Sequence, residues 1–324
     1  MAELPPTADL GMDDAPALDP ANTERILELR HSIESVIRGK SEVVEHTLVT
    51  LFAQGHLLIE DVPGVGKTML AQALARSLDA SFRRIQFTSD LLPSDIVGVS
   101  IYQPQSSSFE FKPGPIFSHV LLADEINRAT PKTQSAMLEA MNEAQVTVDS
   151  SSYPLPQPFI VLATQNPIEH QGTYPLPESQ LDRFLMRIRM GYPSEDAEKE
   201  LLVTQQIEHP IESVEPVMTG RDVIAIQDAV RRVRVDASLV EYLVRLAAAS
   251  RRSEKLSLGV SPRGTLLLQR ATQARALLEG RDFVVPDDVK AIAIPVLSHR
   301  VIPRGPSDAE PIIEDLLSEV AVPL

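Results

Sequence analysis

A short apolar stretch that leads into a glycine-rich turn constrains the fold of this chain more than any other feature. Residues 56–60, His-Leu-Leu-Ile-Glu, predict a buried strand, and residues 61–68, Asp-Val-Pro-Gly-Val-Gly-Lys-Thr, follow it directly. A helix is predicted from Thr68 to about Leu78. A strand, a glycine turn and a helix in this order form a phosphate-binding loop, because backbone N–H groups converge on phosphate oxygens at the positive end of the helix. The chain is therefore expected to have an α/β fold with a site for a phosphate-bearing ligand.

The side chains of this turn suit a nucleoside triphosphate together with Mg²⁺. Lys67 is expected to hold the β- and γ-phosphates, and the Thr68 hydroxyl is expected to face the metal. The full pattern has glycine where this chain has Asp61, but Gly64 and Gly66 keep the cradle. The alternative is a glycine-rich turn that arose by chance. The residues predicted to contact the nucleotide here are Pro63, Gly64, Val65, Gly66, Lys67, Thr68 and Met69.

Two other predicted strands end in polar residues. The apolar run 120–123 is followed by Asp124 and Glu125, which suit a Mg²⁺-organising carboxylate and a base that polarises water. The apolar run 159–163 leads to Asn166, whose neutral amide could bond the attacking water or the γ-phosphate. The alternatives are an ordinary acidic pair at a strand end and a turn-forming asparagine before Pro167.

The order of the predicted elements favours a parallel sheet covered on both faces. Its five strands are expected near residues 56–60, 82–88, 120–123, 159–163 and 185–190. Two long connections are each expected to form a β-hairpin insert, at residues 88–115 and 146–159. Helical patterns follow, at 194–208, 219–233, 236–252, 262–279 and 286–297. We therefore expect an acidic, proline-rich disordered tail, a nucleotide-binding domain, an all-helical lid and an acidic C-terminal segment, at 1–22, 23–191, 192–304 and 305–324.

The charge of the chain is concentrated at its two ends. The net charge is −15, yet residues 1–22 and 305–324 each carry five acidic side chains and no basic one. The remainder is near neutral, which argues against a nucleic-acid-binding face. The chain has no cysteine, which excludes thiolate chemistry, and no apolar run long enough for a membrane helix or a signal peptide. A cytoplasmic protein without membrane insertion is expected.

Two arginines are candidates for contacts with phosphate. Arg183 follows a short predicted helix that starts near Pro177, and Arg263 lies at the start of the helix 262–279, which Ser261 is expected to cap. A guanidinium that reaches a γ-phosphate stabilises the charge of the transition state. The alternatives are a surface ion pair of Arg183 with Asp182 or Glu178 and a solvated arginine at position 263.

In this order the motifs resemble those of AAA+ ATPases, and more closely those of the MoxR family. The resemblance covers about residues 23–304. It rests on residues 60–68 (Glu-Asp-Val-Pro-Gly-Val-Gly-Lys-Thr), 123–129 (Ala-Asp-Glu-Ile-Asn-Arg-Ala), 163–167 (Ala-Thr-Gln-Asn-Pro), 172–178 (Gly-Thr-Tyr-Pro-Leu-Pro-Glu), 181–184 (Leu-Asp-Arg-Phe) and 261–263 (Ser-Pro-Arg). The run 172–178 and the two inserts are its specific part.

The resemblance implies a role for each candidate residue. Lys67 and Thr68 would belong to Walker A, and Asp124 and Glu125 to Walker B. Asn166 would be sensor 1, and Gly39 would form a turn on the adenine side of the nucleotide. Arg183 would be an arginine finger that acts on the neighbouring subunit, and Arg263 would be sensor 2, acting in cis or in trans.

At the level of the whole protein, the resemblance implies an ATP- and Mg²⁺-dependent ATPase that forms a ring, usually hexameric. It also implies chaperone-like remodelling of protein clients or metal insertion, with a von Willebrand factor A-domain partner. A magnesium-chelatase-type subunit, a nucleic-acid-dependent motor and a P-loop scaffold without turnover are the alternatives.

Overall fold

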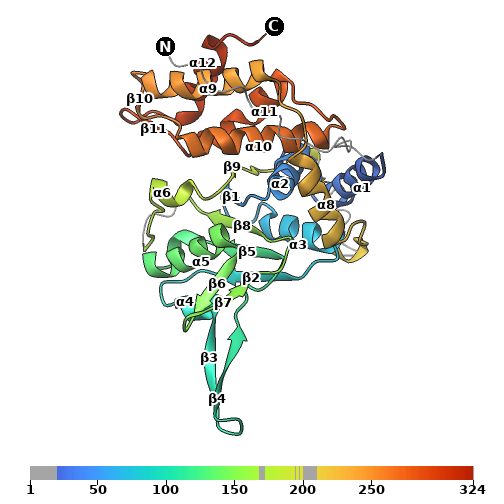
Figure 1. The fold of residues 1–324 in the computed structure, drawn as a ribbon, viewed down its shortest axis with the longest axis vertical. Coiled ribbons are helices and arrows are strands. Elements are labelled where there is room, and N and C mark those ends of the chain that lie inside the picture. Colours follow the sequence, from blue (N-terminus) through green and yellow to red (C-terminus); the bar gives the residue numbers. More distant parts are fainter. Residues whose placement is uncertain (1–19, 168–171, 194, 197, 200–209, 324) are drawn as a thin grey trace, which may run out of the picture.

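A five-stranded parallel sheet forms the centre of the molecule (Figure 1). The computed structural model describes residues 20–167, 172–193, 195–196, 198–199 and 210–323. The strand order is β2-β5-β8-β1-β9. The strands are β1 (Leu57–Glu60), β2 (Phe82–Gln86), β5 (Val120–Asp124), β8 (Ile160–Gln165) and β9 (Met186–Ile188). The predicted parallel sheet is therefore confirmed, with each strand within a few residues of its expected position.

Helices cover both faces of this sheet because alternate residues of a strand point to opposite sides. Leu57 and Ile59 pack in one core with α1 (Pro20–Val36), α2 (Ser41–Phe52) and α3 (Lys67–Ser77). Leu58, between them, packs in a second core with α4 (Pro93–Val97) and α5 (Pro131–Glu143). The helix that follows the glycine turn and the helix that follows the acidic strand end thus lie on opposite faces of the sheet.

Both predicted hairpin inserts are present. The first pairs β3 (Gly98–Gln103) with β4 (Ser108–Pro113) and projects away from the sheet (Figure 1). The second pairs β6 (Gln145–Val148) with β7 (Ser151–Pro154). The expected insert, 88–115, also contains a helix, because Ile96 and Val97 lie in α4 and β3 begins only at Gly98. Helix α4 begins at Pro93, whose fixed φ suits a first helical position.

The lid is helical, as expected, and it also contains a small two-stranded sheet. Its helices are α8 (Gly220–Val230), α9 (Ala237–Arg252), α10 (Pro262–Leu278) and α11 (Pro286–Leu297). Two further segments, β10 (Leu256–Leu258) and β11 (Ile302–Pro303), pair antiparallel. Each is only two or three residues long, too short for an alternating pattern to reveal it. The helix expected at 194–208 lies largely outside the described residues.

The acidic C-terminal segment does not stand apart from the lid. Residues 309–319 form α12 (Ala309–Glu319), and Ile312, Ile313 and Leu316 are buried in the core shared with the lid helices. The acidic residues of α12 face solvent while its apolar stripe faces the lid. The acidic composition of this segment therefore did not reveal that it forms an amphipathic helix. The packed structure therefore extends past the expected end at residue 304. At the other end, α1 begins at Pro20, within the segment 1–22 that was expected to be a tail, and the rest of that segment lies outside the described residues.

Candidate functional site

The glycine turn forms the floor of a cavity of about 350 Å³ at the carboxyl ends of β1, β5 and β8. Gly64 and Gly66 have φ angles of 87° and 99°, a left-handed conformation that suits glycine. Helix α3 begins at Lys67, so its free N–H groups point toward the cavity. The cavity is lined by Pro63, Gly64, Gly66, Lys67, Thr68, Met69, Arg84, Gln86, Asp124, Glu125 and Asn166. The structure thus brings the predicted loop, the Asp124 and Glu125 carboxylates and the Asn166 amide to one cavity. Val65, which was also predicted to contact the nucleotide, does not line this cavity.

Asp61, where the common pattern has glycine, anchors the entry of the turn. It is buried, and its carboxylate accepts hydrogen bonds from the N–H groups of Val62 at 2.8 Å and Gly191 at 2.5 Å. The Lys67 ammonium donates to the Asp61 carbonyl at 2.7 Å. Partial burial lowers the pKa of Lys67, and the carboxylates of Asp124, Asp61 and Glu125 oppose this shift. The Asp61 carboxylate therefore links the glycine turn to Gly191, just after β9. The Lys67 side chain lines the cavity.

Thr164, which sequence reasoning did not single out, joins the two strand-end acids. Its buried hydroxyl donates to Asp124 Oδ1 at 2.6 Å and accepts the backbone N–H of Glu125 at 2.9 Å. Glu125 has a φ of 56°, which few residues other than glycine adopt. The hydroxyl of β8 thus fixes both the Asp124 carboxylate and the strained backbone that carries Glu125.

Three more side chains that the sequence analysis missed hold the acids in this structure. Arg84 donates to Asp124 Oδ2 at 2.5 Å, while Gln86 and Arg128 donate to Glu125 Oε2 at 2.8 and 2.9 Å. Arg84 and Gln86 occupy alternate positions on β2, beside β5. This spacing places both on one side of the strand, but which acids they contact depends on β5 being the neighbouring strand. In this state the Glu125 carboxylate is engaged by two donors.

The oxygen ligands at this cavity fit Mg²⁺. The Thr68 hydroxyl and the Asp124 carboxylate line the same space as Lys67, and Mg²⁺ is commonly held by one or two protein oxygens together with phosphate and water oxygens. The described residues contain no group of three or more His, Cys, Asp or Glu side chains that could hold a metal alone. A magnesium site here would therefore depend on phosphate oxygens for the rest of its ligands.

A second cavity, of about 210 Å³, adjoins the first at Gly64, Gly66 and Met69. Val65 lines it, with the apolar side chains Val36, Ile37, Pro193 and Pro210 and with Arg38 and Lys40. Gly39, between the last two, has a φ of 71° and lets the chain turn between α1 and α2. Gly39, the predicted adenine-side turn, thus lies next to a cavity with mainly apolar walls. That cavity is beside the glycine turn.

Neither Arg183 nor Arg263 lines the cavity at the glycine turn, the candidate nucleotide cavity. Arg183 donates to the carbonyl of Leu138 on α5 at 2.6 Å, and Arg263 donates to Asn142, one turn further along α5, at 3.1 Å. In the described part of the chain Arg183 forms no ion pair with Asp182 or Glu178; instead Arg263 lies 3.5 Å from the Asp182 carboxylate. Ser261 caps α10 as expected, by accepting the N–H of Gly264. Both arginines therefore contact α5, which covers the face of the sheet opposite to α3.

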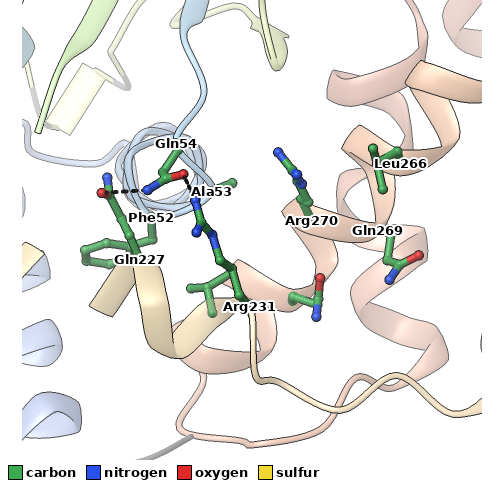
Figure 2. Close-up of a pocket in the computed structure, with 10 residues that line it drawn as sticks. Phe52, Ala53, Gln54, Gln227, Arg231, Leu266, Gln269 and Arg270 are labelled. Atoms are coloured by element: carbon green, nitrogen blue, oxygen red, sulfur yellow. Dashed lines mark hydrogen bonds between the residues drawn. The ribbon is translucent and has the colours of Figure 1, made fainter. Parts of the chain in front are cut away.

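Another cavity, of about 240 Å³, lies between α2, α8 and α10 (Figure 2). Gln54 accepts a hydrogen bond from Arg231 at 2.6 Å and donates to Gln227 at 3.2 Å. Gln227 also donates to the carbonyl of Leu51. No predicted site residue lines this cavity. These contacts join α8 of the lid to the end of α2.

The part of the chain that the structure describes has no helix long and apolar enough to cross a membrane.

Comparisons with known proteins identify the family of this chain. The family described as "ATPase family associated with various cellular activities (AAA)" matches residues 56–186, and the AAA lid domain matches residues 248–320. A Bacillus subtilis protein, YeaC, described as uncharacterized, is 52% identical over 90% of this chain and 93% of its own length. The Mycobacterium tuberculosis protein named Chaperone MoxR1 is 41% identical over 90% of this chain and 80% of its own length.

A crystal structure of a putative ATPase from Cytophaga hutchinsonii superposes with a TM-score of 0.88 at 37% identity, over 94% of this chain and 97% of that chain. It supports the α/β core and the lid as one known architecture. The AAA match at residues 56–186 spans the glycine turn, the two strand-end acids and Asn166. This chain belongs to the MoxR family of AAA+ ATPases.

Proposed function

We propose that this protein hydrolyses ATP with Mg²⁺ and does so as a ring of identical subunits, of which six is the number we expect. One observation carries the proposal: Lys67, Thr68, Asp124, Glu125 and Asn166 line a single cavity, whereas the two candidate arginines lie elsewhere. A site that gathers the phosphate grip, the acids and the amide, and whose own Arg84 is bound to Asp124, would be completed by an arginine from a neighbour.

Each residue in the cavity has a distinct part in the proposed reaction. The loop N–H groups and Lys67 would bind the β- and γ-phosphates, and Thr68 and Asp124 would hold Mg²⁺, which supplies charge neutralisation of the phosphates when bound. Glu125 would orient the attacking water, and Asn166 would bond that water or the γ-phosphate. Gln86 and Arg128 both donate to Oε2 of Glu125, and the carboxylate can accept a further hydrogen bond from a water.

The positions of Arg183 and Arg263 support action in trans for both. Each contacts α5, while the loop and α3 lie on the opposite face of the sheet. Arg183 would stabilise charge on the γ-phosphate of the adjoining subunit, and Arg263 would contribute from the same side. The assembled ring is then the active unit.

We propose remodelling of protein clients as the biological work, in keeping with the word "chaperone" in the name of the mycobacterial relative. The β3–β4 hairpin supports a contact role, because Phe109 and Tyr102 are 74% and 51% exposed on it. The same proposal includes metal insertion, a von Willebrand factor A-domain partner and a cytoplasmic location. It also includes the division of the chain into a nucleotide-binding domain at residues 23–191 and a lid that begins at residue 192. Affinity capture with the Glu125→Gln form in the presence of ATP, compared with Lys67→Ala, would recover such partners.

Two substitutions test the ATPase assignment. Lys67→Ala should abolish ATP binding, whereas Glu125→Gln should bind ATP normally and lose about 100-fold or more in turnover. Fluorescent-nucleotide binding and phosphate release, each with and without EDTA, measure the two effects and the need for Mg²⁺. Normal turnover by Glu125→Gln, or turnover unaffected by EDTA, would contradict the assigned roles.

A further inference from the structure

The carboxylate of Asp182 connects two arginines of the lid. Asp182 follows α6 (Glu178–Leu181) and directly precedes Arg183. Its Oδ1 accepts a hydrogen bond from Arg300 at 2.9 Å, and its Oδ2 lies 3.5 Å from Arg263. Arg263 is in the first turn of α10, and Arg300 lies just after α11. One carboxylate of the sheet domain is therefore bound to two separate segments of the lid.

Arg300 fixes the backbone on both sides of Arg183. Its side chain is 1% exposed, and it donates to the carbonyls of Asp182 at 3.2 Å, Leu185 at 3.0 Å and Phe184. Burial lowers the pKa of Arg300 to about 10 and the Asp182 charge opposes that shift, so the guanidinium is charged at neutral pH. A buried cation left without its carboxylate would be strongly unfavourable. The turn from Asp182 to Leu185 is thus held in one conformation by a group from the lid.

The same arginine also touches the helix that carries Arg263. A Cβ added to Gly264, the next residue, would lie 3.2 Å from Cδ of Arg300. In Figure 1, α6 lies between α5 and the lid. Asp182, the residue after α6, bonds Arg300 of the lid. A cavity of about 710 Å³, lined by Asp182, Arg300, Ser261 and others, adjoins the contact. Asp182 and Arg300 do not line the nucleotide cavity of their own protomer.

We propose that Asp182 and Arg300 form a clamp that fixes Arg183 and Arg263 relative to each other where the lid meets the sheet domain. The contact between the lid and the sheet domain in one protomer then decides whether its two arginines reach the nucleotide of the next protomer. The clamp residues act through the arginines and are positioning residues. This inference rests on the proposed function, which assigns Arg183 and Arg263 to the neighbouring site.

The test is Asp182→Asn, which keeps the shape of the side chain and removes its charge. We expect kcat for ATP to fall about tenfold or more, because small displacements of a catalytic group are costly, while KM changes less than about threefold. Asp315→Asn is the matched control, since it removes the carboxylate of an exposed lid ion pair, with Lys255 at 2.7 Å. It should keep the wild-type kcat. If Asp182→Asn does not assemble, Asp182→Glu keeps the charge and moves it by one methylene, and it should show the same pattern more weakly.

Mixed rings distinguish a clamp from a general structural role. Asp182→Asn subunits keep their own nucleotide cavity, and Lys67→Ala subunits keep their own arginines, so a mixture of the two should regain activity. A mixture of Asp182→Asn with Arg183→Ala should not, because both lack a working arginine. Wild-type kcat in Asp182→Asn, or no recovery with Lys67→Ala, overturns the clamp. If Arg183→Ala with Lys67→Ala also fails to recover, the proposed function fails as well; if that mixture recovers, only the clamp is wrong.

Discussion

Thr164 shows how much of this site depends on a single hydroxyl. The chain places two acids at the end of β5, but neither is oriented by β5 alone. The Thr164 hydroxyl on the adjacent strand bonds the carboxylate of Asp124 and the backbone of Glu125 at once. A hydroxyl can do both because it is a donor and an acceptor.

Replacing Thr164 with valine should therefore impair catalysis more than nucleotide binding. Thr164→Val keeps the shape, leaves the Glu125 N–H unpaired, and should cost about 1–3 kcal/mol of unfolding free energy. We expect kcat to fall about tenfold or more while ATP binding is kept. Thr47→Val is the control, since the buried Thr47 hydroxyl bonds only within α2, to the Val43 carbonyl. Equal kcat values in the two variants would show that the bridge has no catalytic importance.

His56 gives the fold a pH dependence of known sign. Its buried ring accepts the N–H of Val161 on Nδ1 and contacts the Met141 carbonyl through Nε2, as a neutral imidazole does. Burial lowers its pKa from 6.5 to about 4. Its contribution to stability is thus complete above pH 6.5 and is lost as the pH falls from 6.5 toward 4.

The loss should reach about 3 kcal/mol of unfolding free energy at pH 4. Urea unfolding between pH 7 and pH 4 measures it, and His56→Gln should show a shallower decline than the wild type. His31→Gln, at an exposed position, should decline as the wild type does. Parallel curves for all three proteins would contradict the role of His56.

At the residue scale, the sequence predicted the groups that follow a strand directly. Lys67, Asp124, Glu125 and Asn166 were identifiable because parallel strands end at the same edge of a sheet. Arg84 and Thr164 were not, since their importance depends on which strands are neighbours. The order β2-β5-β8 places both beside Asp124, and no local pattern encodes that order.

Helix α10 illustrates how a local signal positions a distant function. Its cap at Ser261 was predicted and is formed, and Arg263 follows in the first turn. A capping side chain fixes the direction in which the first turn of a helix starts. The orientation of Arg263 therefore depends on Ser261.

Loss of this cap should affect turnover as well as stability. Ser261→Ala should lower the unfolding free energy by about 1 kcal/mol, and we expect a several-fold lower kcat because Arg263 is displaced. Thr219→Ala removes the equivalent cap of α8, which accepts the N–H of Asp222, and should cost stability alone. Chemical denaturation and steady-state assays on both variants make the comparison. A kcat that falls equally in both would mean that cap loss acts through stability.

Elements with a long periodic pattern were predicted well, and short ones were not. The helices α9 and α10 lie within one residue of their expected ranges. The strands β10 and β11 were not predicted, because their pairing joins residues 256 and 303, which are far apart in the chain. The acidic residues of α12 masked its apolar stripe of Ile312, Ile313 and Leu316.

For the whole molecule, the decisive feature is the separation of the nucleotide cavity from the two arginines. Leu57 and Leu58, adjacent on β1, belong to different cores, and these cores hold α3 on one side and α5 on the other. A single chain folded this way cannot bring Arg183 to its own cavity without breaking its contact with α5. The sequence predicted both parts, but only the packing shows that they face different ways.

Turnover per chain, measured while the protein is diluted through the range in which it assembles, tests this separation most directly. Light scattering follows assembly in the same samples, at saturating ATP and Mg²⁺. We predict that turnover per chain falls in parallel with the assembled fraction, while nucleotide binding to each chain persists. A dispersed, monomeric chain that hydrolyses ATP at the rate of the assembled protein would contradict the account.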